Sequence, residues 1–96
     1  MAKLHMKGYI LHLLNTVPSG LWDHQIAERV MEEYSHRGRY WQGAVRLTLT
    51  DLYSCGLIEE VEDDLDDGTH FGRDRILIRY ALSDFGRERM REARIE

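Results

Sequence analysis

The spacing of apolar residues predicts that the chain begins with a mostly buried helix at residues 3–15. Ile10, Leu13 and Leu14 recur at helical intervals there and would share one face. Pro18 ensures that the helix has ended, because proline lacks the backbone N–H that a helix interior needs. This segment would supply one apolar wall of a core.

A second helix is expected at residues 23–34, after a turn at residues 16–20. Asp23 is predicted to be its N-cap, because an aspartate side chain can accept hydrogen bonds from the free backbone N–H groups of a first turn. Apolar residues then repeat at every fourth position, at Trp22, Ile26, Val30 and Tyr34. The pattern indicates a helix with one buried face.

A third helix is expected at residues 41–55, after a break at residues 35–40. Gly56 is placed to adopt the left-handed conformation that ends a helix without a steric penalty. The buried face is predicted to consist of Val45, Leu49, Leu52 and Tyr53, and the opposite face of Gly43, Arg46, Thr50 and Ser54. The opposite face is small and polar, which suits a helix that lies against a grooved partner.

After Gly56 the period of the pattern changes from 3.6 residues toward two. A short strand is expected at residues 57–62 and a longer one at residues 75–82. The polar loop between them, residues 63–74, contains two glycines and predicts the tip of a β-hairpin. Ser83 is the expected N-cap of a last helix at residues 84–95.

This order of elements predicts an α+β fold of the winged-helix type. It would contain a three-helix core with a helix-turn-helix, a β-hairpin wing and a C-terminal helix, with a short extra strand around Leu21 and Trp22. Ninety-six residues suffice for one such domain spanning residues 1–96. No apolar run approaches the roughly 20 residues that cross a membrane, and the lone cysteine cannot form an internal disulfide. We therefore expect a cytoplasmic protein.

The net charge of −4 hides an uneven distribution. Seven of the 17 acidic residues lie between positions 59 and 67, where no basic residue occurs. The rest of the chain has 13 basic and ten acidic side chains, a net charge of +3. The acidity is local, and arginines before and after it could meet phosphates.

The chain resembles the PadR-like transcriptional regulators. The stretch from Gly43 to Leu52 followed by Gly56-Leu57-Ile58 is similar to their third-helix signature, and residues 80–86 are similar to the passage from their second wing strand to the last helix. The resemblance implies a winged-helix DNA-binding regulator of transcription, acting as a repressor. A homodimer is expected because one small helix-turn-helix reads too few bases, and the first and last helices are its expected contact surfaces.

In such a protein the N-terminal part of the third helix enters the major groove. An arginine can pair with guanine and a glutamine with adenine, while a glycine allows close approach of the backbone. The residues expected to read bases are Gln42, Gly43, Arg46 and Thr50; those expected to hold phosphates are Arg37, Arg39 and Tyr40 before the helix, with Arg73 and Arg75 on the wing.

Other chemistry is less consistent with the sequence. The five histidines and Cys55 lack metal-ligand spacing, and the acidic stretch lacks the ligand positions of a calcium loop. Cys55 is expected to be a packed thiol. No catalytic motif or phosphate-binding loop is present, so we expect no enzyme, metal or cofactor.

Two alternatives remain open at this stage. The acidic wing and the negative net charge favour a winged-helix module that binds a protein and no DNA. A ligand-responsive regulator would need a small-molecule effector bound between subunits, in an aromatic pocket built from Tyr9, Trp22 or Trp41.

Overall fold

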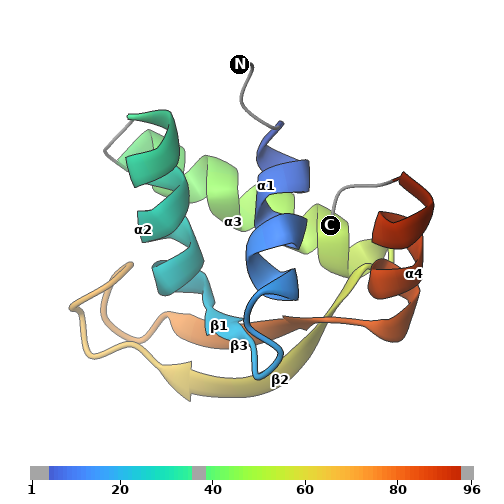
Figure 1. Cartoon of the computed structure of the whole chain (residues 1–96). Helices are drawn as coiled ribbons and strands as arrows, with labels where there is room; N and C mark the ends of the chain where they lie inside the picture. Colours follow the sequence, from blue (N-terminus) through green and yellow to red (C-terminus); the bar gives the residue numbers. More distant parts are fainter. Residues whose placement is uncertain (1–4, 36–38, 94–96) are drawn as a thin grey trace.

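The structure is a computed structural model that describes residues 5–35 and 39–93. The described residues form four helices and a three-stranded antiparallel sheet with strand order β1-β3-β2 (Figure 1). In chain order the elements are α1 (Met6–Asn15), β1 (Leu21–Trp22), α2 (Asp23–Tyr34), α3 (Arg39–Ser54), β2 (Ile58–Leu65), β3 (Ile76–Leu82) and α4 (Asp84–Ala93). This α+β arrangement is compatible with the winged-helix layout expected from the sequence.

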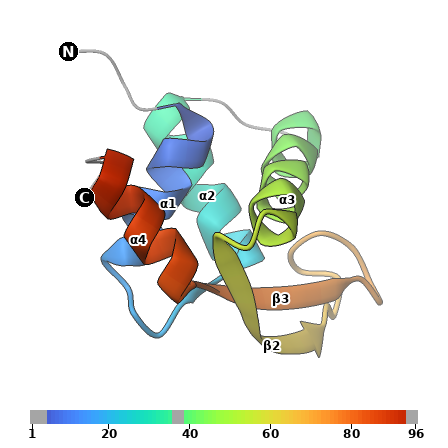
Figure 2. The ribbon, with the colours of Figure 1, turned by 90° about the vertical axis from the view of Figure 1, so that its right-hand side faces the viewer.

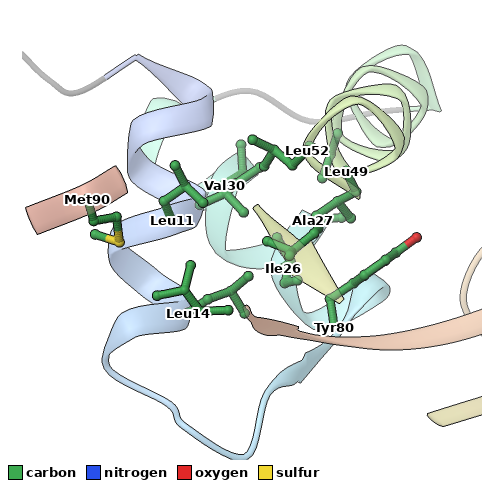
Figure 3. Close-up of a cluster of buried hydrophobic side chains, with 13 residues drawn as sticks. Leu11, Leu14, Ile26, Ala27, Val30, Leu49, Leu52, Tyr80 and Met90 are labelled. Atoms are coloured by element: carbon green, nitrogen blue, oxygen red, sulfur yellow. The ribbon is translucent and has the colours of Figure 1, made fainter. Parts of the chain in front are cut away.

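The core lies between the helical layer and the sheet. α1 and α2 bury the faces that their apolar spacing predicts, α3 buries its predicted face apart from Tyr53, and α4 adds Met90 (Figure 3). Complete burial of one such aliphatic side chain is worth about 1.5–3 kcal/mol. The apolar side chains with at most 2 % exposure are Ile10, Leu14, Ile26, Ala27, Val30, Val45, Leu49, Leu52, Ile58 and Met90.

The end of α3 and the start of α4 confirm two expectations from the sequence. Gly56 has φ +77°, and the N–H groups of Gly56 and Leu57 donate to the carbonyls of Tyr53 and Leu52, both at 3.0 Å. These two bonds make a Schellman motif. Ser83 caps α4, since its Oγ accepts from the N–H of Gly86 at 2.9 Å.

Several predicted boundaries differ from the structure. α3 begins at Arg39, two residues before the expected start, and α4 ends at Ala93 within the described residues. β2 extends to Leu65, whereas the sequence predicted a strand ending at residue 62. Pairing with the apolar strand β3 explains this extension, because it holds the charged residues of β2 in a ladder that their own β-propensity disfavours.

The connection between β2 and β3 is called here the hairpin loop, residues 66–75. It curls back from the tip of the hairpin toward the helical layer (Figures 1 and 2). A bulge at Val61 interrupts the ladder, since Glu60 pairs with Tyr80 and Glu62 with Arg79. Such a bulge increases the twist of the hairpin locally.

Candidate nucleic-acid interface

One side of α3 is open to solvent from Tyr40 to Thr50. The side chains of Tyr40 and Leu47 are 76 % and 71 % exposed, and Gly43 and Thr50 are also exposed. A Cβ built at Gly43 would meet no atom of the described chain within 4 Å. Packing among the described residues therefore does not require glycine at this position, whereas the close approach of a partner to the helix backbone would.

Two apolar residues of α3 lie differently from the expectation. Tyr53 is not part of the buried face, because it sits at the edge of that face and is 45 % exposed, with its ring centroid 6.4 Å from that of Tyr80. Leu47 was left out of both predicted faces, and it occupies the exposed side between Gly43 and Thr50. The exposed strip is therefore less polar than the sequence suggested.

Arg46 is half-buried at the boundary between α3 and the hairpin loop. Its guanidinium carbon lies 4.8 Å from the centroid of the Phe71 ring, within the range of a cation–π interaction. Phe71 itself packs against the hydrophobic core. The hairpin loop thus supports the one arginine that the sequence places on the exposed face of α3.

Gln42 lies beside the same loop. A shallow groove of about 470 Å³ is lined by Gln42 together with Thr69, His70 and Phe71. Gln42 and Arg46, two of the polar side chains expected to read bases, therefore border the hairpin loop. No sequence pattern indicates this proximity, because strand β2 separates the loop from α3 along the chain.

A single buried carboxylate organises the hairpin loop. Asp66 is 2 % exposed, and its two oxygens accept from four backbone N–H groups within the next six residues. The donor-to-oxygen distances are 2.9 Å from Gly68, 3.3 Å from His70, 2.6 Å from Phe71 and 2.9 Å from Gly72. The carboxylate thereby satisfies backbone groups that the turn leaves without a ladder partner.

Two opposing effects act on the pKa of Asp66. Desolvation by burial raises it, but the hydrogen bonds from Gly72, Phe71, Gly68 and His70 together outweigh burial, so the pKa lies well below its ordinary value. Asp66 is consequently a fixed negative charge at neutral pH. Sequence reasoning assigned this residue to a solvated acidic loop and missed its structural role.

Asp23 is not the N-cap of α2. The capping position belongs to Trp22, whose backbone N–H donates to Oε1 of Gln25 at 2.9 Å. Asp23 is the first helical residue, 4 % exposed, and its Oδ2 accepts from the N–H of Ile78 at 3.2 Å, while Oδ1 accepts from the N–H of His24 at 2.8 Å. Its carboxylate thus links α2 to β3. Burial raises its pKa, and the two backbone bonds only partly offset that effect.

A groove of about 380 Å³ separates α3 from β3. The α3 side is lined by Arg46, Leu47 and Thr50, and the sheet side by Ile76 and Tyr80. Ile76 is 57 % exposed. The groove is therefore a largely apolar depression next to the exposed strip of α3.

The acidic residues lie mainly along β2 and not at the hairpin tip. The sequence placed residues 63 to 67 in the loop, but β2 continues to Leu65, so Asp63 and Asp64 belong to the strand. Glu62 pairs with Arg79 at 3.0 Å. The exposed carboxylates of this strand are those of Glu59, Glu60, Glu62, Asp63 and Asp64.

Two basic side chains stand at the hairpin tip instead. Arg73 and Arg75 are both exposed and belong to the hairpin loop. Backbone bonds fix the position of Arg75: its carbonyl accepts from Asp66 N–H at 2.7 Å, and its N–H donates to the carbonyl of Gly72 at 3.1 Å. The loop that Asp66 organises therefore carries both wing arginines expected from the sequence.

The remaining predicted residues precede α3 or begin it. Arg37 lies outside the described residues. Arg39 is the first residue of α3. Tyr40 follows it, and its exposed ring meets that of Trp41 edge to face at 5.2 Å between centroids.

Within residues 5–35 and 39–93 no three His, Cys, Asp or Glu side chains lie close enough together to hold a metal ion, and no helix is long and apolar enough to cross a membrane. Cys55 is exposed and so is not the packed thiol expected, because it occupies the helix end beside Gly56.

The aromatic residues considered for an effector pocket have separate neighbours in the described chain. Tyr9 meets Tyr34 at 5.9 Å between ring centroids, and Trp22 meets His24 at 6.3 Å. Trp41 contacts Tyr40 instead.

Comparison with models of protein families, with curated proteins and with solved structures found no match.

Proposed function

We propose that this protein is a winged-helix regulator that binds double-stranded DNA, with α3 in the major groove and the hairpin loop as its wing. One observation carries the proposal. The exposed N-terminal half of α3 and the hairpin loop form one continuous surface, joined by the contact between Arg46 and Phe71. That surface includes the arginines at positions 46, 73 and 75.

The side chains of α3 suit base reading. A small residue on the outward face lets the helix backbone approach the groove closely, and the open space above Gly43 leaves room for that approach. Arg46 is held by Phe71 in a fixed orientation, which lowers the entropy cost of a bidentate contact with guanine. Leu47, the exposed residue that the sequence did not flag, offers an apolar contact for a thymine methyl group.

Arg73 and Arg75 would contact phosphates or the minor groove from the wing, and Arg37, Arg39 and Tyr40 would do so before α3. Five carboxylates lie along β2, whereas the hairpin loop carries Arg73 and Arg75 with the exposed Asp67 and Asp74, so most of the acidic stretch lies away from the wing arginines. Two copies of the chain, joined through α1 and α4, would read two half-sites and repress transcription from them. Figure 2 shows α1 and α4 next to each other on the side away from the hairpin.

The test is selection of bound sequences from a pool of random DNA duplexes, followed by salt titration of the recovered site. We expect a palindromic motif and an affinity that falls steeply as salt rises. Arg46→Ala should lose about 1–3 kcal/mol of binding free energy and relax the base preference at one position of each half-site.

Arg29→Ala is the matched control, because Arg29 is exposed on α2 and its removal changes the net charge equally. It should weaken binding far less and leave the motif unchanged. Equal losses from both variants would mean that Arg46 contributes charge alone. Absence of binding to any duplex at low salt would exclude the proposal.

A second function is favoured by one observation, the row of five exposed carboxylates along β2. They make the edge strand β2 acidic, which suits a basic protein partner, as in winged-helix modules that bind no DNA. Absence of duplex binding, combined with capture of a defined basic protein that Asp63→Lys abolishes, would support this alternative.

A further inference from the structure

The hairpin loop contacts α2 through two histidines. His24 is the second residue of α2, and His70 lies in the loop. Their ring centroids are 3.6 Å apart and their planes differ by only 9°, so the imidazoles are stacked face to face. Trp22 lies nearly parallel to His24 at 6.3 Å between centroids, with an angle of 16°. His24 and His70 are called here the imidazole pair.

The charge state of the pair depends on groups from three elements. Burial lowers the pKa of His24, and the adjacent His70 lowers it further. The carboxylates of Asp23 and Glu28 on α2 and of Asp66 in the loop act in the opposite direction without reversing the shift. Asp67 faces His70 from within the loop, and Arg46 of α3 is the cation that interacts with Asp23.

Stacking at this distance tolerates neutral rings and one proton, but it disfavours two protons. Two imidazolium rings 3.6 Å apart place like charges in direct contact, and only part of that repulsion is screened by solvent. In a separated loop the two rings no longer face each other, so both can carry a proton without this repulsion. Acidification therefore favours the separated state over the stacked one.

The internal conformation of the hairpin loop should not change when the histidines are protonated. Asp66 keeps its charge far below the pH at which histidines titrate, so its four backbone hydrogen bonds persist. The loop would leave α2 as a preformed unit and take Phe71 away from Arg46.

We propose that the imidazole pair is a proton-sensitive latch, which holds the hairpin loop against α2 and α3 at neutral pH and releases it when both rings are protonated. The latch would control whether Arg46 is supported by Phe71. This goes beyond binding of DNA, and it can be tested on the free protein.

The experiment is a pH titration of the isotopically labelled full chain by NMR between about pH 5 and pH 8. We expect the backbone resonances of His70, Phe71 and Gly72, and the side-chain resonance of Arg46, to shift together with the two imidazoles. The nuclear Overhauser effects between the Phe71 ring and Arg46 should weaken over the same pH range. A loop that keeps these signals unchanged while both histidines titrate would overturn the proposal.

His70→Phe supplies the decisive variant, because phenylalanine can stack on His24 but cannot be protonated. In this variant the contact of Phe71 with Arg46 should persist at pH 5, and the pKa of His24 should rise because the neighbouring imidazole that lowers it is gone. His12→Phe is the matched control, since His12 is exposed on α1; it should leave the transition as in the parent chain. A His70→Phe chain that still releases its loop at the same pH would refute the latch. The NMR samples contain no DNA, so the outcome for the latch is independent of the outcome for DNA binding.

Discussion

Asp23 and Asp66 are both almost fully buried, at 4 % and 2 % exposure, yet their carboxylates are held by different parts of the chain. Asp66 receives all four of its backbone hydrogen bonds from residues 68 to 72, directly after it. Asp23 receives one from its neighbour His24 and one from Ile78, 55 residues away. One aspartate organises a local turn, and the other links two elements that are distant in sequence.

The number of donors decides the direction in which each pKa moves. Burial raises the pKa of both carboxyl groups, but four N–H donors overcome it at Asp66 and two do not at Asp23. The buried negative charge therefore stabilises the folded chain at Asp66 and costs free energy at Asp23. The hairpin loop, which is proposed to contact DNA, is held by Asp66, the carboxylate whose charge is stabilising.

The largest effect on global stability should come from Asp23→Ala. This variant leaves the N–H of Ile78 without its acceptor at the junction of α2 and β3, which should cost about 1–3 kcal/mol of the free energy of unfolding. Asp84→Ala is a matched control, because Asp84 is also the first residue of a helix but is exposed and pairs only with Arg87. Its loss should stay below about 1 kcal/mol. Chemical denaturation would measure both, and equal losses would mean that Asp23 acts only through the helix dipole.

Asp66→Ala should have a smaller global effect and a strong local one. Removal of the shared acceptor frees the N–H groups of Phe71 and Gly72, so their hydrogen exchange should approach that of an unstructured peptide. Asp67→Ala is the matched control, because the carboxylate of Asp67 accepts only from Thr69 and is exposed. Retained protection of Phe71 and Gly72 in Asp66→Ala would show that the core contact of Phe71 holds the loop without the carboxylate.

The same contrast explains how much the sequence could predict. Apolar spacing and turn residues predict the helices and the two hairpin strands, and Gly56 and Ser83 have the capping roles expected of them, because these signals are local. The short strand at Leu21 and Trp22 was expected only from the order of the other elements. Asp23 was assigned to the N-cap because its bond to Ile78 depends on tertiary contact. The contact between Arg46 and Phe71 was missed for the same reason.

Asp66 was missed although its bonding is local. Its signal was hidden among the other acidic residues of the stretch, and only the fold distinguishes the exposed carboxylates of β2 from the buried one at the turn. The glycines at positions 68 and 72, with φ +103° and +148°, are the feature that could have indicated a tight loop closing on a carboxylate.

The smallest expected effect is that Asp66 and Asp23 change the free energy of unfolding over two separate ranges of pH. The folded-state pKa of Asp66 is depressed, so its stabilisation is complete above the ordinary value of 3.8 and is lost as pH falls below it. The folded-state pKa of Asp23 is raised, so the cost of its buried charge is relieved as pH falls through that raised pKa toward 3.8. Below 3.8 the Asp23 contribution should no longer change.

The measurement is the free energy of unfolding of the parent chain, Asp23→Asn and Asp66→Asn between about pH 2.5 and pH 7, taken as differences so that the other titrating groups cancel. The difference between the parent chain and Asp66→Asn should be flat above pH 3.8 and shrink below it. The difference for Asp23→Asn should change only above pH 3.8. Two curves that change over the same window would mean that both carboxylates experience the same balance of burial and hydrogen bonding, which would contradict the division between local and long-range donors.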